Sequence, residues 1–234
     1  MSTEIREEKI LELLSPNAST SIKDIAKKLY VSEPTARRYV NELARRGLVI
    51  RTHGGCMPSA AAFDGNTPMH LRFSSGSEEK RELAERAAAL VPDHATLFLD
   101  SSSTAFFTVP YLAEKKGLTV ITSGVKTALA LAEHGIKTMC IGGFIDPHNL
   151  SSNSAYAIEG VRRVNADFFF FSCDALSDDG ELSDNSFEES LLRREFMARS
   201  RVRVLMLDSS KLGKKCRYTL GTLADVEHFI SPEN

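Results

Sequence analysis

The spacing of hydrophobic positions divides the chain into two parts. In the first 55 residues, apolar positions recur every three or four residues, which predicts helices over 3–14, 22–29 and 33–46. Ser21 and Ser32 stand where helix-capping hydroxyls are expected, with Asp24 three residues after Ser21, and Gly47 is suited to end the third helix. The segment LVIRTHGG, residues 48–55, then predicts a short hairpin.

The second part of the chain alternates short apolar runs with helical stretches. The predicted strands are 96–100, 118–122, 137–143, 167–173, 202–208 and 227–231, and the predicted helices are 78–91, 104–116, 126–134, 156–164 and 188–200. Strands of this kind, separated by helices, predict a mostly parallel sheet covered on both faces. Residues 57–76, rich in Pro, Ser, Gly and Ala, predict a linker. We therefore expect domains at 1–56 and 77–234, which we call the head and the body.

Charge separates the same two parts. The head carries a net charge of +3 over residues 1–55, and the remainder carries −5. A basic head on an acidic body favours a polyanionic partner for the head. The four cysteines are far apart and form no C-x-x-C pair, so we expect neither a metal nor a cofactor. The longest apolar run is too short to span a membrane, and the N-terminus lacks a secretory signal, so we expect a cytoplasmic protein.

The third predicted helix has the two faces that a DNA-reading helix needs. Ala36, Val40 and Leu43 form the apolar stripe, and Thr35 and Arg38 lie on an outward stripe. The residues that we expect to contact DNA bases or phosphates are Ser32, Thr35, Arg37, Arg38, Arg51 and His53. The alternative is a helical bundle used for dimerisation, whose arginines are merely solvated.

Residues 21–55 resemble the winged helix-turn-helix of DeoR-type bacterial transcriptional regulators. That family typically reads VS-x-x-T-x-RRDL-x-x-L-x-x-x-G-x-x-x-R-x-HGG. The matching residues here are Val31, Ser32, Thr35, Arg37, Arg38, Leu43, Gly47, Arg51, His53, Gly54 and Gly55. Tyr39 stands where the family has Asp, and we include it among the DNA-binding positions because the exchange can alter base preference.

Polar residues follow the predicted strands of the body, where ligands of open α/β sheets bind. The first strand is followed by Asp100, Ser101, Ser102, Ser103 and Thr104, and hydroxyls that open a helix suit a phosphate group. The other residues expected at the same sheet edge are Thr122, Ser123, Gly142, Gly143, Asp174, Asp208, Ser210 and Lys211. The alternative is that each Ser or Thr simply caps a helix.

The body resembles the sugar-phosphate sensor domain of DeoR regulators, whose fold is similar to ribose-5-phosphate isomerase. The family's D-x-G-[ST]-T, TN, GG and D-x-S-K motifs correspond to stretches beginning at Asp100, Thr122, Gly142 and Asp208, and its later Glu falls at Glu188 or Glu189, of which we take Glu188. Family glycines are replaced at several of these positions. The resemblance implies that Asp100, Ser102, Ser103, Thr104, Thr122, Ser123, Gly142, Gly143, Asp174, Glu188 and Lys211 bind the effector.

These observations lead to two functional hypotheses. The first is a DNA-binding regulator, a repressor of a sugar-metabolism operon, whose body senses a phosphorylated sugar and which is not an enzyme. The alternative is a phosphosugar isomerase with an accessory head, in which Asp174, Glu188 and Lys211 supply acid–base groups. An arginine-rich helix has no use in a freestanding isomerase. Because one helix-turn-helix makes few contacts, we expect a homodimer or homotetramer on double-stranded operator DNA.

Overall fold

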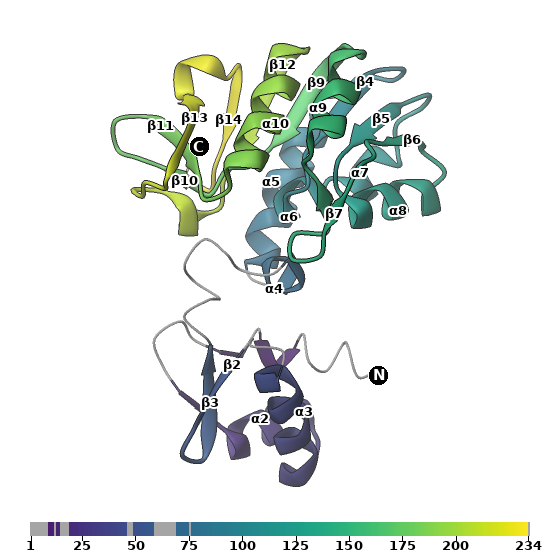
Figure 1. The fold of residues 1–234 in the computed structure, drawn as a ribbon. Coiled ribbons are helices and arrows are strands. Elements are labelled where there is room, and N and C mark those ends of the chain that lie inside the picture. The colour runs from purple at the N-terminus through teal and green to yellow at the C-terminus, as the bar shows by residue number, and fades with distance from the viewer. Residues whose placement is uncertain are drawn as a thin grey trace. The chain divides into compact units, whose positions relative to one another are not determined.

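We analysed the protein as a computed structural model, which describes residues 9–11, 13–14, 19–45, 49–58, 69–74 and 76–233. The chain forms two compact units, Met1–Ser75 and Gly76–Asn234 (Figure 1). The predicted helix over 3–14 and the helix-ending Gly47 lie mostly or wholly outside the described residues. Helix α4, Met69–Ser74, occupies part of the predicted linker. None of the helices in the described ranges has the length and apolar character needed to cross a membrane.

The described part of the head contains helices α2 and α3 and a three-stranded sheet of order β1-β3-β2, and residues 9–11 are also helical. Its elements are β1 Thr20–Ser21, α2 Ile22–Leu29, α3 Glu33–Arg45, β2 Val49–Thr52 and β3 Gly55–Pro58. The Ser21 hydroxyl caps α2 by accepting a hydrogen bond from the backbone N–H of Asp24 at 3.0 Å, as its sequence position predicts. The apolar stripes of the two helices and Val49 of β2 share one core, which also holds Ile10.

Two adjacent glycines shape the hairpin of the head. Gly54 adopts a φ of +93°, which closes a two-residue turn between β2 and β3. At Gly55 the chain of β1 comes so close that an added Cβ would collide with the carbonyl oxygen of Thr20. Gly55 therefore allows β1 to pair with β3. The two backbone requirements explain why glycines stand next to each other at the turn of the hairpin.

The body contains a six-stranded parallel sheet of order β14-β12-β9-β4-β5-β6. Its strands are β4 Thr96–Leu99, β5 Thr119–Thr122, β6 Lys137–Cys140, β9 Ala166–Phe171, β12 Ser200–Met206 and β14 His228–Ile230. The helices of the body are α5 Ser77–Ala89, α6 Ser103–Phe106, α7 Val109–Leu112, α8 Val125–Glu133, α9 Ala155–Arg162 and α10 Phe187–Ala198. All six strands were expected from their apolar runs, and the predicted α/β class is confirmed.

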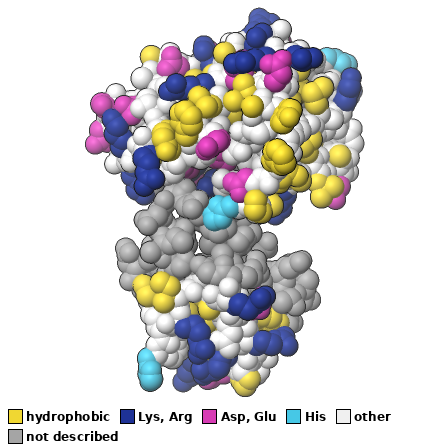
Figure 2. Space-filling view, viewed as in Figure 1, with side chains coloured by type: hydrophobic (Ala, Val, Ile, Leu, Met, Phe, Trp, Pro, Cys, Tyr) yellow, Lys and Arg dark blue, Asp and Glu magenta, His cyan; other side chains and the backbone are white. Residues whose placement is uncertain are grey.

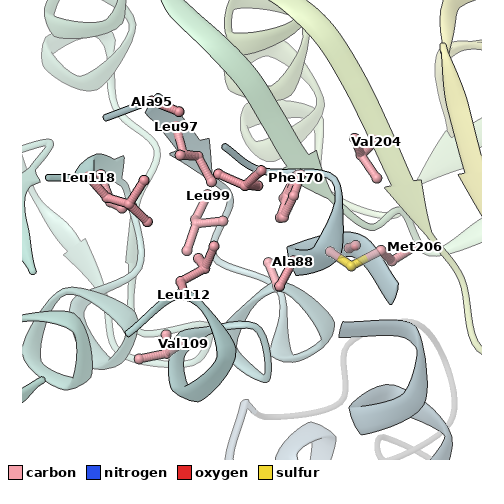
Figure 3. Packing of buried hydrophobic residues seen from close by; sticks show 14 of the residues in the cluster. Ala88, Ala95, Leu97, Leu99, Val109, Leu112, Leu118, Phe170, Val204 and Met206 are labelled. Atoms are coloured by element: carbon pink, nitrogen blue, oxygen red, sulfur yellow. The ribbon is translucent and has the colours of Figure 1, made fainter. Parts of the chain in front are cut away.

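Each face of this sheet has its own apolar core. Alternate residues of β4, such as Leu97 and Leu99, pack in a cluster with residues of α5, α7 and α8 (Figure 3). The intervening Phe98 packs in a second cluster with residues of α9 and α10, including Phe196 at a ring-centroid distance of 4.8 Å. The period-two alternation of strand side chains thus supplies both layers and fixes the strand ends between them.

Several elements of the body were not expected. The missed strands are β7 Ile145–Asp146, β8 Ser151–Ser152, β10 Ala175–Leu176, β11 Glu181–Asp184 and β13 Tyr218–Thr222, and two 3-10 turns, Ser209–Lys211 and Leu223–Asp225, were missed as well. Strands β10, β11 and β13 form a small antiparallel sheet. The single helix expected over 104–116 is divided into α6 and α7. Pro110 lies in the first turn of α7, and a proline is not tolerated within a continuous helix at this point.

Candidate functional site

Helix α3 and the residue before it carry most of the side chains that were expected to read DNA. Ser32 precedes the helix, and its hydroxyl lies 2.9 Å from the hydroxyl of Thr35 and accepts from the Thr35 backbone N–H at 3.4 Å. Arg37 and Arg38 are exposed on the same helix. Because Ala36, Val40 and Leu43 are completely buried, the orientation of α3 in the head is fixed and its arginines point away from the core.

Tyr39 corrects the expectation that it contacts DNA. Its side chain is only 2% exposed and belongs to the core of the head. The guanidinium of Arg38 lies 5.3 Å from the centroid of the Tyr39 ring, within the range of a cation–π contact. Tyr39 therefore orients Arg38 from beneath. Its large apolar ring fills core space that a carboxylate would not.

The hairpin carries the other two residues expected at DNA. Arg51 lies on β2 opposite Cys56, and His53 occupies the turn beside Gly54; both side chains are exposed. The head thus has two polar, positively charged surfaces, on α3 and on the hairpin. A helix that enters a groove and a hairpin that follows the adjacent backbone form such a pair of surfaces.

In the body, Asp100 organises the end of the sheet. One carboxylate oxygen accepts from the backbone N–H of Ser102 at 2.9 Å and from its hydroxyl at 2.5 Å. The other accepts from the N–H of Ser172 at 3.2 Å and from Nε of Arg193 at 3.0 Å. Asp100 therefore joins the loops after β4 and β9 to helix α10. It is a buried positioning residue with its acceptor sites already used.

Arg193 lies at the centre of this cluster, and it was not expected there because it occurs in the middle of helix α10, with no local motif around it. Besides Asp100, its guanidinium contacts Asp184 at 2.9 Å and Glu189 at 3.5 Å. Burial lowers the pKa of Arg193, but the attraction of Asp184, Glu189 and Asp100 outweighs burial and raises it well above its usual value. Burial raises the pKa of Asp184 to about 6, against the opposing effect of Arg193.

A small hollow opens beside this cluster. Its polar lining comes from Asp100, Ser101, Ser123, Asn153, Glu189 and Arg193. The Glu189 side chain is 5% exposed, and within the described residues its carboxylate has long contacts with Arg193 at 3.5 Å and with the Ser151 hydroxyl at 3.4 Å. Glu188, the residue expected in the effector site, is exposed on the first turn of α10 and accepts from the hydroxyl of Ser186. Of the two glutamates that fit the family motif, it is Glu189 that faces the hollow.

Lys211 extends along the same edge of the sheet. Its ammonium group donates to the hydroxyl of Ser172 at 2.7 Å, which places the charge directly at the end of β9. Asp208 follows β12, and although burial raises the pKa of its carboxyl, Lys211 and Lys80 hold it below its usual value. Lys211 and Asp208 are thus brought together with the residues that follow β9, as the strand order requires.

The remaining expected residues play mostly local roles. Ser102 caps α6 by accepting from the Ala105 N–H, and Thr122 accepts from the N–H of Gly124. Asp174 accepts from the backbone and side-chain amides of Asn185. Ser103, Thr104 and Ser123 are buried, whereas Gly142 and Gly143 are exposed after β6. Among the described residues, the buried hydroxyl of Thr104 has no hydrogen-bond partner.

Two family models match this chain. Residues 6–58 match the DeoR-like helix-turn-helix domain, and residues 75–233 match the DeoR C-terminal sensor domain. The chain belongs to the DeoR family. It is accordingly a DNA-binding transcriptional regulator. The interpretation as a phosphosugar isomerase with an accessory head is not supported.

Characterised DeoR-family proteins align with nearly the whole chain. The glycerol-3-phosphate regulon repressor of Escherichia coli K12 is 27% identical over 220 residues, which are 93% of this chain and 86% of that protein. The L-fucose operon activator of Haemophilus influenzae is 28% identical over 227 residues, 97% of this chain and 90% of that protein. Both relatives are named as regulators, one as a repressor and one as an activator.

Two solved structures align with this chain at low sequence identity. The δ subunit of eIF2B from Chaetomium thermophilum aligns with a TM-score of 0.50 and 15% identity over 97% of this chain and 87% of that chain. Ribose 5-phosphate isomerase A from Neisseria gonorrhoeae aligns with a TM-score of 0.44 and 18% identity over 59% of this chain and 54% of that chain. The similarity to the eIF2B subunit concerns the fold alone.

Proposed function

We propose that this DeoR-family regulator is a cytoplasmic repressor of a sugar-metabolism operon, released from or retained on its operator by a phosphorylated sugar that binds the body. The observation that carries the proposal is the polar cluster around Arg193 at the carboxyl edge of the sheet. Buried polar groups of this number are costly unless they are well paired, and here they surround a small hollow.

The composition of the cluster indicates how a phosphorylated sugar would lie. Carboxylates outnumber cations around Arg193, which favours neutral hydroxyl donors there over a phosphate group. Lys211 offers a positive charge on the same edge, beside Ser172. The sugar hydroxyls therefore belong near Glu189, and the phosphate belongs near Lys211 and the hydroxyl-rich loop after β4.

Control of DNA binding requires that the sugar phosphate bind the operator-competent and operator-free states unequally. The head supplies the operator contacts through Ser32, Thr35, Arg37, Arg38, Arg51 and His53. Relatives named for a glycerol-3-phosphate regulon and an L-fucose operon support carbohydrate-related control. We expect the working form to be a homodimer or homotetramer on double-stranded DNA.

The test is a thermal-shift screen of phosphorylated sugars followed by operator titrations. A ligand that binds only the folded state raises the melting temperature. We expect at least one sugar phosphate to do so and to change operator affinity five-fold or more. With that ligand, Lys211→Ala should lose the response while its ligand-free operator affinity stays within two-fold of the wild type.

The matched control is Lys214→Ala, three residues further along. The Lys214 side chain is exposed and donates to the Ser210 carbonyl oxygen rather than to Ser172. This variant should respond as the wild type does. If Lys211→Ala responds at the same ligand concentration as the wild type, the phosphate does not bind at Lys211.

A further inference from the structure

An uncovered apolar face lies at one end of the parallel sheet. Strand β6 is the last strand of the sheet, and Met139 on it is 48% exposed. Phe144, just before β7, is 81% exposed, and Ile145, the first residue of β7, is 54% exposed. Tyr156 on the first turn of α9 is 73% exposed. Hydrophobic side chains are visible over α9 and β7 in Figure 2. We call these four residues the β6 face.

Local contacts bring the segments that carry these residues close together. Met139 and Ile141 lie two residues apart and so point to the same side of the sheet. The side chain of Ile141 reaches within 3.5 Å of the Cβ position of Gly160, and Tyr156 is one helical turn before Gly160 on the same side of α9. The backbone at Gly143, next to Phe144, approaches the Ser154 hydroxyl at the start of α9 so closely that an added Cβ would collide with it.

The free edge of β6 adds polar capacity to this apolar face. Among the described strands β6 pairs only with β5, so its outer N–H and C=O groups have no strand partner. Such edges favour the addition of a strand from another chain, and soluble proteins usually cover or charge them. The edge carries the exposed Met139 and Cys140, and the charged residue of this strand is the exposed Lys137 at its start.

The size of the face fits a protein interface. An aromatic side chain buries about 150–250 Å², so Phe144 and Tyr156 at their exposures offer roughly 300 Å². Met139, Ile145 and the strand edge extend this area toward the ~800 Å² that each partner contributes to a standard interface. Isolated exposed apolar side chains are ordinary on a monomer, and apolar patches of about 300–600 Å² are often functional.

We propose that the β6 face is the surface through which two copies of this chain pair about a twofold axis. This inference rests on the proposed function, because a helix-turn-helix protein that reads repeated half-sites must present two heads. A twofold contact uses the same patch on both partners, so an edge strand beside an apolar face can serve both sides at once. The effector hollow is lined by other residues and remains separate from the β6 face.

The first experiment compares the mass of the full-length protein and two variants by light scattering at micromolar concentration. The double variant Phe144→Glu/Tyr156→Glu places two charges in the β6 face, at side chains exposed enough to leave the fold intact. Phe187→Glu is the control, since Phe187 is 50% exposed on α10 and its ring packs on Tyr218 of β13. We expect the double variant to have half the wild-type mass or less and Phe187→Glu to match the wild type.

The second experiment uses the native thiols. Cys140 is exposed on β6, Cys56 and Cys173 are buried, and Cys216 is half-buried. A short bis-maleimide should therefore link wild-type chains into covalent dimers through Cys140. Cys140→Ser should abolish this link, and the double variant should reduce it at least ten-fold.

The outcomes separate the interface from the function. If the wild type is oligomeric and the double variant has the same mass, the interface lies elsewhere and the inference is overturned. A monomeric wild type, with and without operator DNA, would remove the pairing altogether. Sugar-phosphate control of operator binding is measured independently by titration, so it can succeed when the interface fails, and the interface can succeed when that control fails.

Discussion

Arg38 is the side chain on which DNA recognition depends most directly. It is exposed on α3, and the buried Tyr39 ring lies 5.3 Å beneath its guanidinium. We expect Arg38→Ala to weaken operator binding by about 1–3 kcal/mol, roughly 5- to 150-fold, because a bidentate base contact is lost. A gel-shift titration on operator and on a scrambled duplex measures both affinity and specificity.

The control for Arg38 is another exposed arginine far along the chain. Arg201 lies on β12 and contacts only Asp167, at 3.7 Å, among the ion pairs of the described residues. Arg201→Ala should leave operator binding within two-fold of the wild type. Equal effects of the two substitutions would mean that Arg38 contributes general charge and does not read a base.

Asp184 makes the stability of the body depend on pH. Its folded pKa is about 6 because of burial, above the ordinary value of 3.8, so the folded state retains the proton more tightly. Its contribution to the free energy of unfolding is therefore greatest below about pH 4 and falls as pH rises to about 6. Asp184→Asn should remove this fall, which is on the order of 1–3 kcal/mol. Urea unfolding at pH 4 and pH 7 measures it.

Glu227 provides a control of opposite sign. Its bidentate ion pair with Arg203 holds the pKa of the Glu227 carboxyl at about 2, below its ordinary 4.5. This pair stabilises the fold above about pH 4.5 and is lost as pH falls toward 2. Glu227→Gln should therefore reduce stability at pH 7 more than at pH 3. Parallel pH profiles for Asp184→Asn and Glu227→Gln would contradict both assignments.

At the level of elements, Gly55 determines whether strand β1 can pair with β3. Any side chain at residue 55 would collide with the Thr20 carbonyl, so Gly55→Ala must push β1 away from β3. We expect a loss of roughly 1–3 kcal/mol in the stability of the head, as in overpacked sites. Amide exchange at Thr20–Ser21 and over β3 should accelerate in the variant.

Gly142 is the matched control for this backbone effect. Nothing lies within 4 Å of an added Cβ there, and its φ is not in the left-handed region. Gly142→Ala should leave amide exchange in the head unchanged. If Gly55→Ala also leaves amide exchange in the head unchanged, the close approach of β1 is not required for the head to fold.

The sequence predicted elements well where their own side chains decide the structure. The apolar runs of β4 and β9 and the stripe of α3 are such cases. Strand β11, ELSD, was missed because its buried Asp184 is stabilised by Arg193 on another element, and no local pattern contains that pairing. For the same reason, the sequence could not show whether Glu188 or Glu189 faces the hollow. Both fit the sequence motif, and only the packing of α10 decides which of them is buried.

At the level of the whole molecule, the basic head should make operator binding strongly dependent on salt. Each neutralised phosphate lowers the slope of log affinity against log salt by about 0.9. Arg51→Ala removes one exposed cation from the hairpin of each head. We expect the slope to become less negative by about 2 for a dimer, with little change in preference between sequences. Titrations from low to moderate salt measure it, and an unchanged slope would remove Arg51 from the phosphate contacts.

The strand order of the body also affects the protein while it is being made. Strand β4 pairs with β9, about 70 residues later in the chain, and the sheet is completed only by β14 at residues 228–230. The head consists of local contacts and leaves the ribosome first. At a synthesis rate of about 5–20 residues per second, roughly 10–40 s pass between completion of the head and completion of the body's sheet. During that interval a nascent head has no sensor, and if pairing depends on the β6 face it also has no partner. A single head binds DNA weakly, so synthesis order would keep unregulated chains off the operator.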